Sequence, residues 1–159
     1  LKIRVMNSKT AMDMVQYLGG SPTPTSWGEL YTALGQGTVV GAENNLPSFT
    51  SSKHYEVCKH FTLNAHARIP DVIWISAKIW NSLSTDEHKW LQIAADESSV
   101  YEKELWQTMT EESLEKAKEE GVTFYEVDQK LFADKVQPLY DAITDDKIRE
   151  LIANIREVR

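Results

Sequence analysis

The sequence has a single cysteine, Cys58, so no disulfide can form within the chain. It also has no long apolar run, since none approaches the roughly 18 residues that a transmembrane helix needs. Basic residues are in the minority, with 17 Lys and Arg against 24 Asp and Glu and a formal net charge of −7. Nucleic acids and anionic membrane surfaces both attract clustered cations. We therefore expect no nucleic-acid partner and no membrane-embedded segment.

Patterns typical of catalytic and metal sites are missing as well. The sequence has no Gly-rich phosphate loop, no Ser nucleophile elbow and no paired-carboxylate signature. His54, His60 and His66 are spaced six residues apart, which is not the i, i+4 spacing that places two metal ligands on one helix face. Cys58 and His60 have no third group to orient them as nucleophile and base. We expect no metal, no cofactor and no enzyme activity, which favours a binding protein.

Short strand patterns alternate with helical patterns in the first half of the chain. We expect strands at 2–6, 21–25, 38–42 and 60–65, and helices at 9–18, from Trp27 to Gly35, and at 51–58. Strand–helix repeats of this length predict parallel pairing with right-handed crossovers, so the fold class is α/β. The two prolines of 21–25 place that strand on a sheet edge or in a crossing segment.

The second half carries the strongest strand pattern and the longest helix. Residues 71–77 are apolar on both faces, which predicts a central strand. A capping box at Ser84 and Glu87 opens a helix of about 35 residues, or roughly 50 Å. That length exceeds one compact domain of this size, so the helix either kinks or bridges two lobes. The rest is predicted as a strand at 122–127, a helix after Asp128 interrupted by Pro138, and a last helix capped by Thr144.

Two predicted strand ends, forty residues apart, carry polar side chains. Arg4 and Asn7 close the first strand, and Glu43, Asn44 and Asn45 follow the strand at 38–42. Open α/β sheets bind ligands at the carboxyl ends of their strands. A guanidinium matches a carboxylate with two parallel hydrogen bonds, and the N-terminus of the next helix favours an anion. These residues predict a site for a small carboxylate.

Each of these residues also has a structural interpretation. Arg4 alternates with Ile3 and Val5, so it points away from the face that they bury, and it could be an ordinary exposed strand arginine. The two asparagines could form a turn or cap a helix, with which Pro47 agrees. Trp27, at the start of a helix, is either part of the core or a platform for a ligand. The sequence leaves these alternatives open.

Several blocks resemble one protein family. They are Arg4-Val5-Met6-Asn7, Gly20–Pro24, Glu29–Leu34, Gly41-Ala42-Glu43-Asn44 and Ser52–Val57. In order and spacing they resemble the extracytoplasmic solute receptors of tripartite ATP-independent periplasmic (TRAP) transporters, of the dicarboxylate-binding family. The resemblance covers essentially the whole chain. Two departures are Val40, where the family usually has Asp, and Gly35, where it usually has Gln.

The resemblance implies a periplasmic-binding-protein-like architecture of two α/β lobes. The chain looks like the carboxyl-terminal portion, with 1–69 and 110–159 in the second lobe and 70–109 crossing to a first lobe that is largely absent from it. By position in the blocks, Arg4 pairs with the ligand carboxylate, Asn7 and Asn44 bind the ligand, and Trp27 packs on it. Asn45, His66 and Asp71 are further implied pocket residues, and the long helix bridges the lobes.

The implied function is that of a periplasmic receptor that passes a small organic acid to the TRAP membrane permease for ion-gradient-driven uptake. The asparagines and His66 favour a hydroxyl-rich sugar acid, a uronate or an aldonate, over a four-carbon dicarboxylate, because more hydroxyls need more partners. An alternative is a lyase or isomerase that uses Arg4 for its substrate and His66 or Glu43 as base. A third is an interaction module without a ligand.

Overall fold

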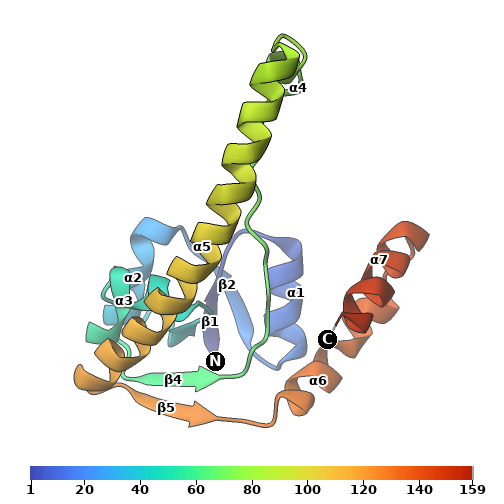
Figure 1. Ribbon diagram of the computed structural model, residues 1–159. Coiled ribbons are helices and arrows are strands. Elements are labelled where there is room, and N and C mark those ends of the chain that lie inside the picture. Colours follow the sequence, from blue (N-terminus) through green and yellow to red (C-terminus); the bar gives the residue numbers. More distant parts are fainter. Residues whose placement is uncertain (159) are drawn as a thin grey trace.

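The structure, a computed structural model, describes residues 1–158 (Figure 1). Its first part is a three-stranded parallel sheet in the order β2-β1-β3. The elements are β1 (Lys2–Val5), α1 (Lys9–Tyr17), β2 (Ser21–Pro24), α2 (Trp27–Gly35) and β3 (Gly41–Ala42). The predicted parallel α/β arrangement is confirmed, and the two polar strand ends belong to neighbouring strands, since Arg4 is aligned with Ala42.

The edge position predicted for the proline-containing strand is also confirmed. β2 pairs with β1 alone, and the order β2-β1-β3 leaves its other side without a strand. Pro22 and Pro24 have no N–H to donate, so they fit a strand whose second edge makes no ladder. β3 is shorter than the predicted 38–42, because the chain is still turning after Gly37, whose φ of +70° favours glycine.

A second, two-stranded parallel sheet is made by β4 (His60–Leu63) and β5 (Thr123–Glu126). Between β3 and β4 lie α3 (Leu46–Ser51) and a 3₁₀ turn, η1 (His54–Glu56). The helix predicted over 51–58 is therefore wrong. Helix formation starts earlier because Asn45 caps α3 and Pro47 suits its first turn. It stops earlier because Lys53 adopts a left-handed conformation with φ of 55°.

Two clusters of buried side chains form the core. The first lies between α2 and the connection to β3 and consists of Leu30, Ala33, Leu34 and Val39, with Val57 and Cys58 packed on it. The second joins α3 and η1 to the end of the long helix and consists of Phe49, Tyr55, Ala117 and Val122, with Cys58, Phe61 and Phe124 against it. Cys58 contacts both clusters and so lies where they meet.

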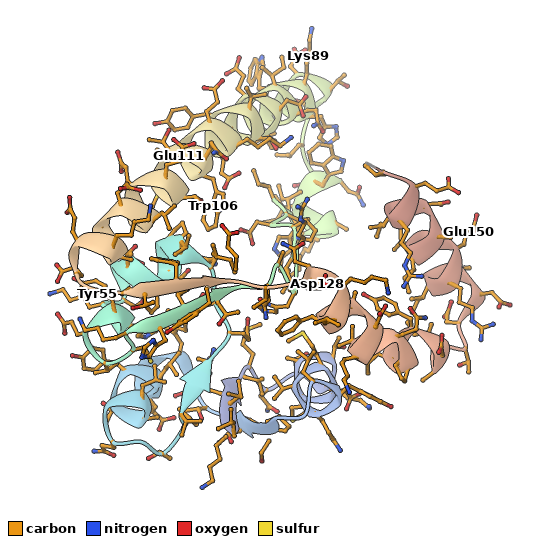
Figure 2. The ribbon with its side chains drawn as sticks, turned by 90° about the horizontal axis from the view of Figure 1, so that it is seen from below. Tyr55, Lys89, Trp106, Glu111, Asp128 and Glu150 are labelled. Carbon is orange, nitrogen blue, oxygen red and sulfur yellow. The ribbon has the colours of Figure 1, made fainter. Side chains whose placement is uncertain are left out.

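The long helix α5 (Thr85–Glu119) is a single element of 35 residues that begins with the predicted capping box at Ser84. Its buried residues are Ser113 and Ala117, close to its C-terminal end. There the Thr50 hydroxyl donates to the Ser113 hydroxyl over 2.8 Å and ties α5 to α3. The rest of α5 rises away from both sheets toward α4 (Ala77–Trp80), and side chains such as Lys89 project from it (Figures 1 and 2).

The strand predicted over 71–77 is wrong in this structure. Residues 64–76 contain no strand, and Trp74 is 89% exposed, with Val72 and Ile73 nearly as open. A strand exists only by pairing, and none of β1 to β5 pairs with this segment. The sequence pattern is that of a strand covered on both faces, whereas the described residues supply neither the pairing partner nor the cover.

Two helices complete the chain, α6 (Gln129–Asp141) and α7 (Asp146–Glu157). α6 packs on α1, contains Pro138 and is capped by Asp128, as predicted. α7 is capped by Asp145 and not by Thr144, because the Asp145 carboxylate accepts the N–H groups of Lys147 and Ile148. Among residues 1–158 no helix combines the length and the apolar character that crossing a bilayer requires.

Candidate functional site

Arg4 lies in the middle strand of the first sheet, between Thr23 of β2 and Ala42 of β3. Only 4% of it is exposed, so the interpretation as an exposed strand arginine is wrong. Its Nε donates to the backbone carbonyl of Thr25 over 3.0 Å. No carboxylate of residues 1–158 forms an ion pair with it. The guanidinium therefore has a backbone partner for Nε and no protein counter-charge among the described residues.

Trp27 opens α2 beside this arginine. The Arg4 guanidinium carbon lies 5.6 Å from the centroid of the Trp27 ring, within the range of a cation–π contact. Trp27 is 47% exposed, so the core interpretation is wrong. Ser26 precedes it at the N-cap, but its hydroxyl donates to the Glu29 carboxylate and caps no backbone N–H.

His54 is a member of this group that the sequence did not single out. It is buried, with 4% exposed, and its ring centroid lies 5.2 Å from that of Trp27 in an edge-on arrangement. Burial, and secondarily the positive charge of Arg4, lower the pKa of His54 below its usual value of 6.5. His54 is therefore a neutral imidazole near neutral pH. In the sequence it appeared only in the block Ser52–Val57 and among the three histidines whose spacing argued against a metal site.

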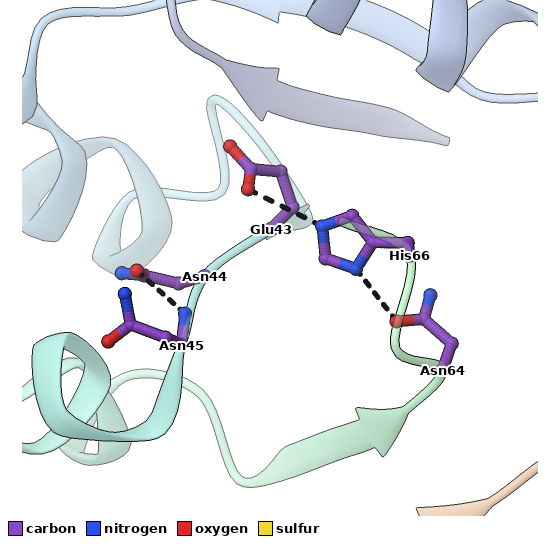
Figure 3. Close-up of polar contacts among 5 residues, drawn as sticks. All are labelled: Glu43, Asn44, Asn45, Asn64 and His66. Carbon is purple, nitrogen blue, oxygen red and sulfur yellow. Dashed lines mark hydrogen bonds and ion pairs between the residues drawn. The ribbon is translucent and has the colours of Figure 1, made fainter. Parts of the chain in front are cut away.

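A second polar cluster surrounds His66 (Figure 3). The His66 Nδ1 lies 2.8 Å from Oδ1 of Asn64, and its Nε2 lies 3.5 Å from Oε2 of Glu43. Ala65 between them has a φ of 47°, a sharp turn that allows Asn64 and His66 to contact each other. Glu43 follows β3, so this cluster lies at the same strand end as Asn44. Glu43 and Asn64 orient the imidazole that the sequence proposed as a ligand group.

Asn44 and Asn45 differ in role although they are adjacent. The Oδ1 of Asn45 accepts the N–H of Ser48 over 2.8 Å and caps α3, so Asn45 has the structural role of a helix cap. The Oδ1 of Asn44 accepts the N–H of Asn45 over 2.9 Å. The Nδ2 of Asn44 is buried and has no partner among the described residues. A buried donor without an acceptor is expensive, which makes Asn44 the better candidate for a ligand contact.

The two remaining predicted residues are exposed. Asn7 lies just beyond the end of β1, near Arg4 in the chain, and no hydrogen bond of its side chain is found within residues 1–158. Asp71 lies in the unpaired segment 64–76. The structure therefore brings together Arg4 and Trp27, and separately His66 and Asn64 with Glu43, but it leaves Asp71 apart from both groups.

The arrangement suits recognition of a carboxylate that also carries hydroxyls. Arg4 supplies a fixed positive charge, Asn44 a free N–H donor, and Trp27 an open ring face. His66 and Glu43 can each exchange hydrogen bonds with hydroxyl groups. Each residue lies in a parallel strand or shortly after its carboxyl end, where such sheets bind ligands. Arg4 is in β1, Trp27 follows β2, Glu43 and Asn44 follow β3, and His66 follows β4.

Comparison with known proteins agrees with this geometry. Residues 1–147 match the model of the bacterial extracellular solute-binding protein family 7. A solute-binding protein from Chromohalobacter salexigens is 34% identical over 162 aligned residues, which cover 100% of this chain and 48% of that protein. The chain thus spans about half the length of this curated relative.

Solved structures show the same fold. A TRAP periplasmic solute-binding protein from Xanthobacter autotrophicus with bound β-D-galacturonate superposes with a TM-score of 0.93 at 37% identity, covering 99% of this chain and 53% of that one. Another from Chromohalobacter salexigens with bound D-glucuronate superposes with a TM-score of 0.95 at 33% identity, covering 100% and 54%. The chain has the fold of about half of these two-lobed proteins.

The different roles of the two asparagines lead to a prediction. Replacing Asn45 with alanine removes the cap of α3 and should lower the free energy of unfolding by about 1 kcal/mol. Asn45→Asp should keep most of the stability, because a carboxylate oxygen also caps. Urea denaturation followed by circular dichroism measures both variants. An Asn45→Ala protein as stable as the parent would contradict the capping role.

Proposed function

The chain belongs to family 7 of the bacterial extracellular solute-binding proteins, and on that premise we propose that it is part of a TRAP-transporter receptor for a small organic acid. The receptor works in the periplasm and delivers its ligand to the membrane permease for ion-gradient-driven uptake. The ligand is a sugar acid, such as a uronate or an aldonate, in preference to a four-carbon dicarboxylate.

The observation that carries this proposal is the buried guanidinium of Arg4. It has a carbonyl partner for Nε and no carboxylate partner among residues 1–158. The carboxylate of an organic acid supplies the missing charge through two parallel hydrogen bonds. Because the guanidinium is held by Thr25 and covered by Trp27, little conformational entropy is lost when the ligand arrives.

The preference for a sugar acid rests on the groups around Arg4. We assign the free Nδ2 of Asn44 and the imidazole of His66 to ligand hydroxyls, Asn7 to the carboxylate, and the open face of Trp27 to the sugar ring. Asn45 contributes to the pocket indirectly, because it caps α3. We assign Asp71 to the pocket as part of the unpaired segment 64–76. The two solved relatives described above hold galacturonate and glucuronate, which supports a uronate.

Calorimetry on the full-length receptor tests the role of Arg4. Arg4→Ala should weaken binding of D-glucuronate or D-galacturonate by about 2–5 kcal/mol, because it removes one partner of a buried charged pair. Arg4→Lys should restore only part of the affinity, because an ammonium lacks the planar fork. Arg149→Ala, which removes an exposed arginine of α7, is the matched control and should bind like the parent.

Thermal unfolding of the Arg4 variants keeps the result interpretable. If Arg4→Ala unfolds at the parent temperature and still binds every tested uronate and dicarboxylate with parent affinity, Arg4 does not anchor the carboxylate. If the parent binds a four-carbon dicarboxylate more tightly than any sugar acid, the preference for a sugar acid is reversed while the anchoring role stands.

The receptor is not an enzyme, as is the rule for its family. The alternative, a lyase or isomerase with His66 or Glu43 as base, predicts turnover of the bound acid. We expect D-glucuronate to be recovered chemically unchanged after long incubation with the full-length protein, with proton NMR as the measurement. Slow conversion that disappears in Glu43→Gln would support the enzyme instead.

We also propose that residues 70–109 cross to a first lobe, leaving 1–69 and 110–159 in the second. The support is the exposure of Val72, Ile73 and Trp74 in a segment whose sequence is that of a doubly covered strand. The anchoring of α5 only near Ser113 and Ala117 agrees with this division.

Hydrogen exchange on the full-length protein checks this crossing. The amides of 71–76 should be strongly protected there, since they would lie in a sheet completed by the first lobe. The turn 142–145 between α6 and α7 should exchange rapidly and serves as the internal control. Equally rapid exchange at 71–76 would mean that the segment remains unpaired.

A further inference from the structure

We propose that His54 is a positioning residue of the ligand site, holding the Trp27 indole beside Arg4 and coupling ligand binding to proton uptake. The inference rests on the proposed function, because it requires a carboxylate at Arg4. His54 is buried and is not among the residues assigned to the ligand above, so this role is additional to theirs.

The packing of His54 supports the positioning role. Its ring is 4% exposed and meets the Trp27 ring at 66°, with 5.2 Å between the centroids. No hydrogen bond to either ring nitrogen of His54 is found within residues 1–158, whereas His60 has one and His66 has two. Packing, and not a hydrogen bond, therefore fixes the imidazole, and the aromatic contact with Trp27 is part of what holds both rings.

Trp27 contacts Arg4 and His54 in different geometries. The Arg4 guanidinium lies 5.6 Å from the indole centroid, while His54 meets the indole edge-on. Trp27 is almost half exposed, so the protein packs against only part of its surface. Removal of the His54 ring would leave the indole free to change rotamer, and the ligand platform would no longer have one defined position.

The positive charge of Arg4 near His54 is not balanced by a carboxylate of the described residues. Arg4 of β1 is the charge that lowers the pKa of His54, in addition to burial. On α2 the carboxylate of Glu29 accepts from the Ser26 hydroxyl, and the Tyr31 hydroxyl donates to Glu56 over 2.6 Å. No carboxylate of the described residues is paired with His54 itself.

The other charges around η1 are cationic or already engaged. Lys53 is exposed and precedes His54 in the chain. Lys116 of α5 lies over the ring of Tyr55, 5.7 Å from its centroid. Glu56, the acidic residue of η1, is bonded to Tyr31. Protonation of His54 in the empty site would therefore add a second positive charge beside Arg4 without a counter-charge.

Ligand binding changes this balance. A carboxylate on Arg4 offsets the field that Arg4 exerts at His54, so the pKa of His54 is higher in the complex than in the free protein. Between the two pKa values the complex holds more protons than the free receptor. By linkage, binding takes up protons in this range, and affinity rises as the pH falls through it. A sugar carboxylate stays ionised there.

Isothermal titration calorimetry of the full-length receptor with D-glucuronate tests both roles. Titrations at about pH 5.5 and about pH 7.5, each in two buffers of different ionisation enthalpy, give the number of protons taken up on binding. The parent should take up a measurable fraction of a proton at the lower pH and almost none at the higher. His60→Gln should retain this uptake, since His60 is exposed, is hydrogen-bonded to Tyr125 and is not assigned to the ligand.

Two substitutions at His54 separate packing from protonation. His54→Phe keeps an aromatic edge against Trp27, so its affinity at the higher pH should fall less than that of His54→Ala, and it should lose the proton uptake. His54→Ala loses both, and its affinity should fall roughly two- to tenfold at either pH, the range expected for an aromatic pair. An NMR titration of the His54 ring in the parent, with and without D-glucuronate, gives the two pKa values directly even if a variant fails to fold.

The possible outcomes are distinct. Binding with equal proton uptake in the parent and His54→Phe, or an unchanged His54 pKa on ligand addition, overturns the proton coupling. Parent affinity in His54→Ala at the higher pH overturns the positioning role. In both cases the proposed receptor function stands. A parent receptor that binds neither uronates nor dicarboxylates overturns the proposed function itself, and this inference with it.

Discussion

The proposed site depends on one constraint, the burial of Arg4 in the middle strand of a parallel sheet with no carboxylate partner among the described residues. The protein satisfies Nε with the Thr25 carbonyl and covers the group with Trp27. Both partners come from the segment that follows β2, so the pairing of β1 with this edge strand places them. A buried cation of this kind lowers the stability of the empty protein and raises its affinity for an anion.

This local charge contrasts with the net charge of −7. Surface carboxylates are screened within about 8–10 Å at physiological ionic strength, whereas a buried guanidinium acts in a medium of lower dielectric. The acidic exterior therefore does not prevent recognition of an acidic ligand. The net charge opposes the binding of extended polyanions such as nucleic acids. The chemistry of the proposed site depends instead on Arg4 and its immediate neighbours.

Local patterns predicted most of the helices and strands, and errors arose where the outcome depended on distant residues. The strand that contains Arg4 and the helix starting at Trp27 follow from the spacing of their apolar residues. The helix predicted over 51–58 failed because Asn45 and Pro47 start helix formation earlier. The strand at 71–77 failed because pairing needs a neighbour. His54 was missed because neither its burial nor its contact with Trp27 can be seen in its own segment.

The short turn η1 connects the site to the long helix. His54 and Tyr55 are adjacent and both buried, but they contact different parts of the protein. His54 meets Trp27 beside Arg4, while Tyr55 packs in the cluster that contains Ala117 of α5. Because protein interiors have low compressibility, packed side chains transmit strain. η1 therefore links the aromatic contact beside Arg4 to the anchored end of α5 through two neighbouring side chains.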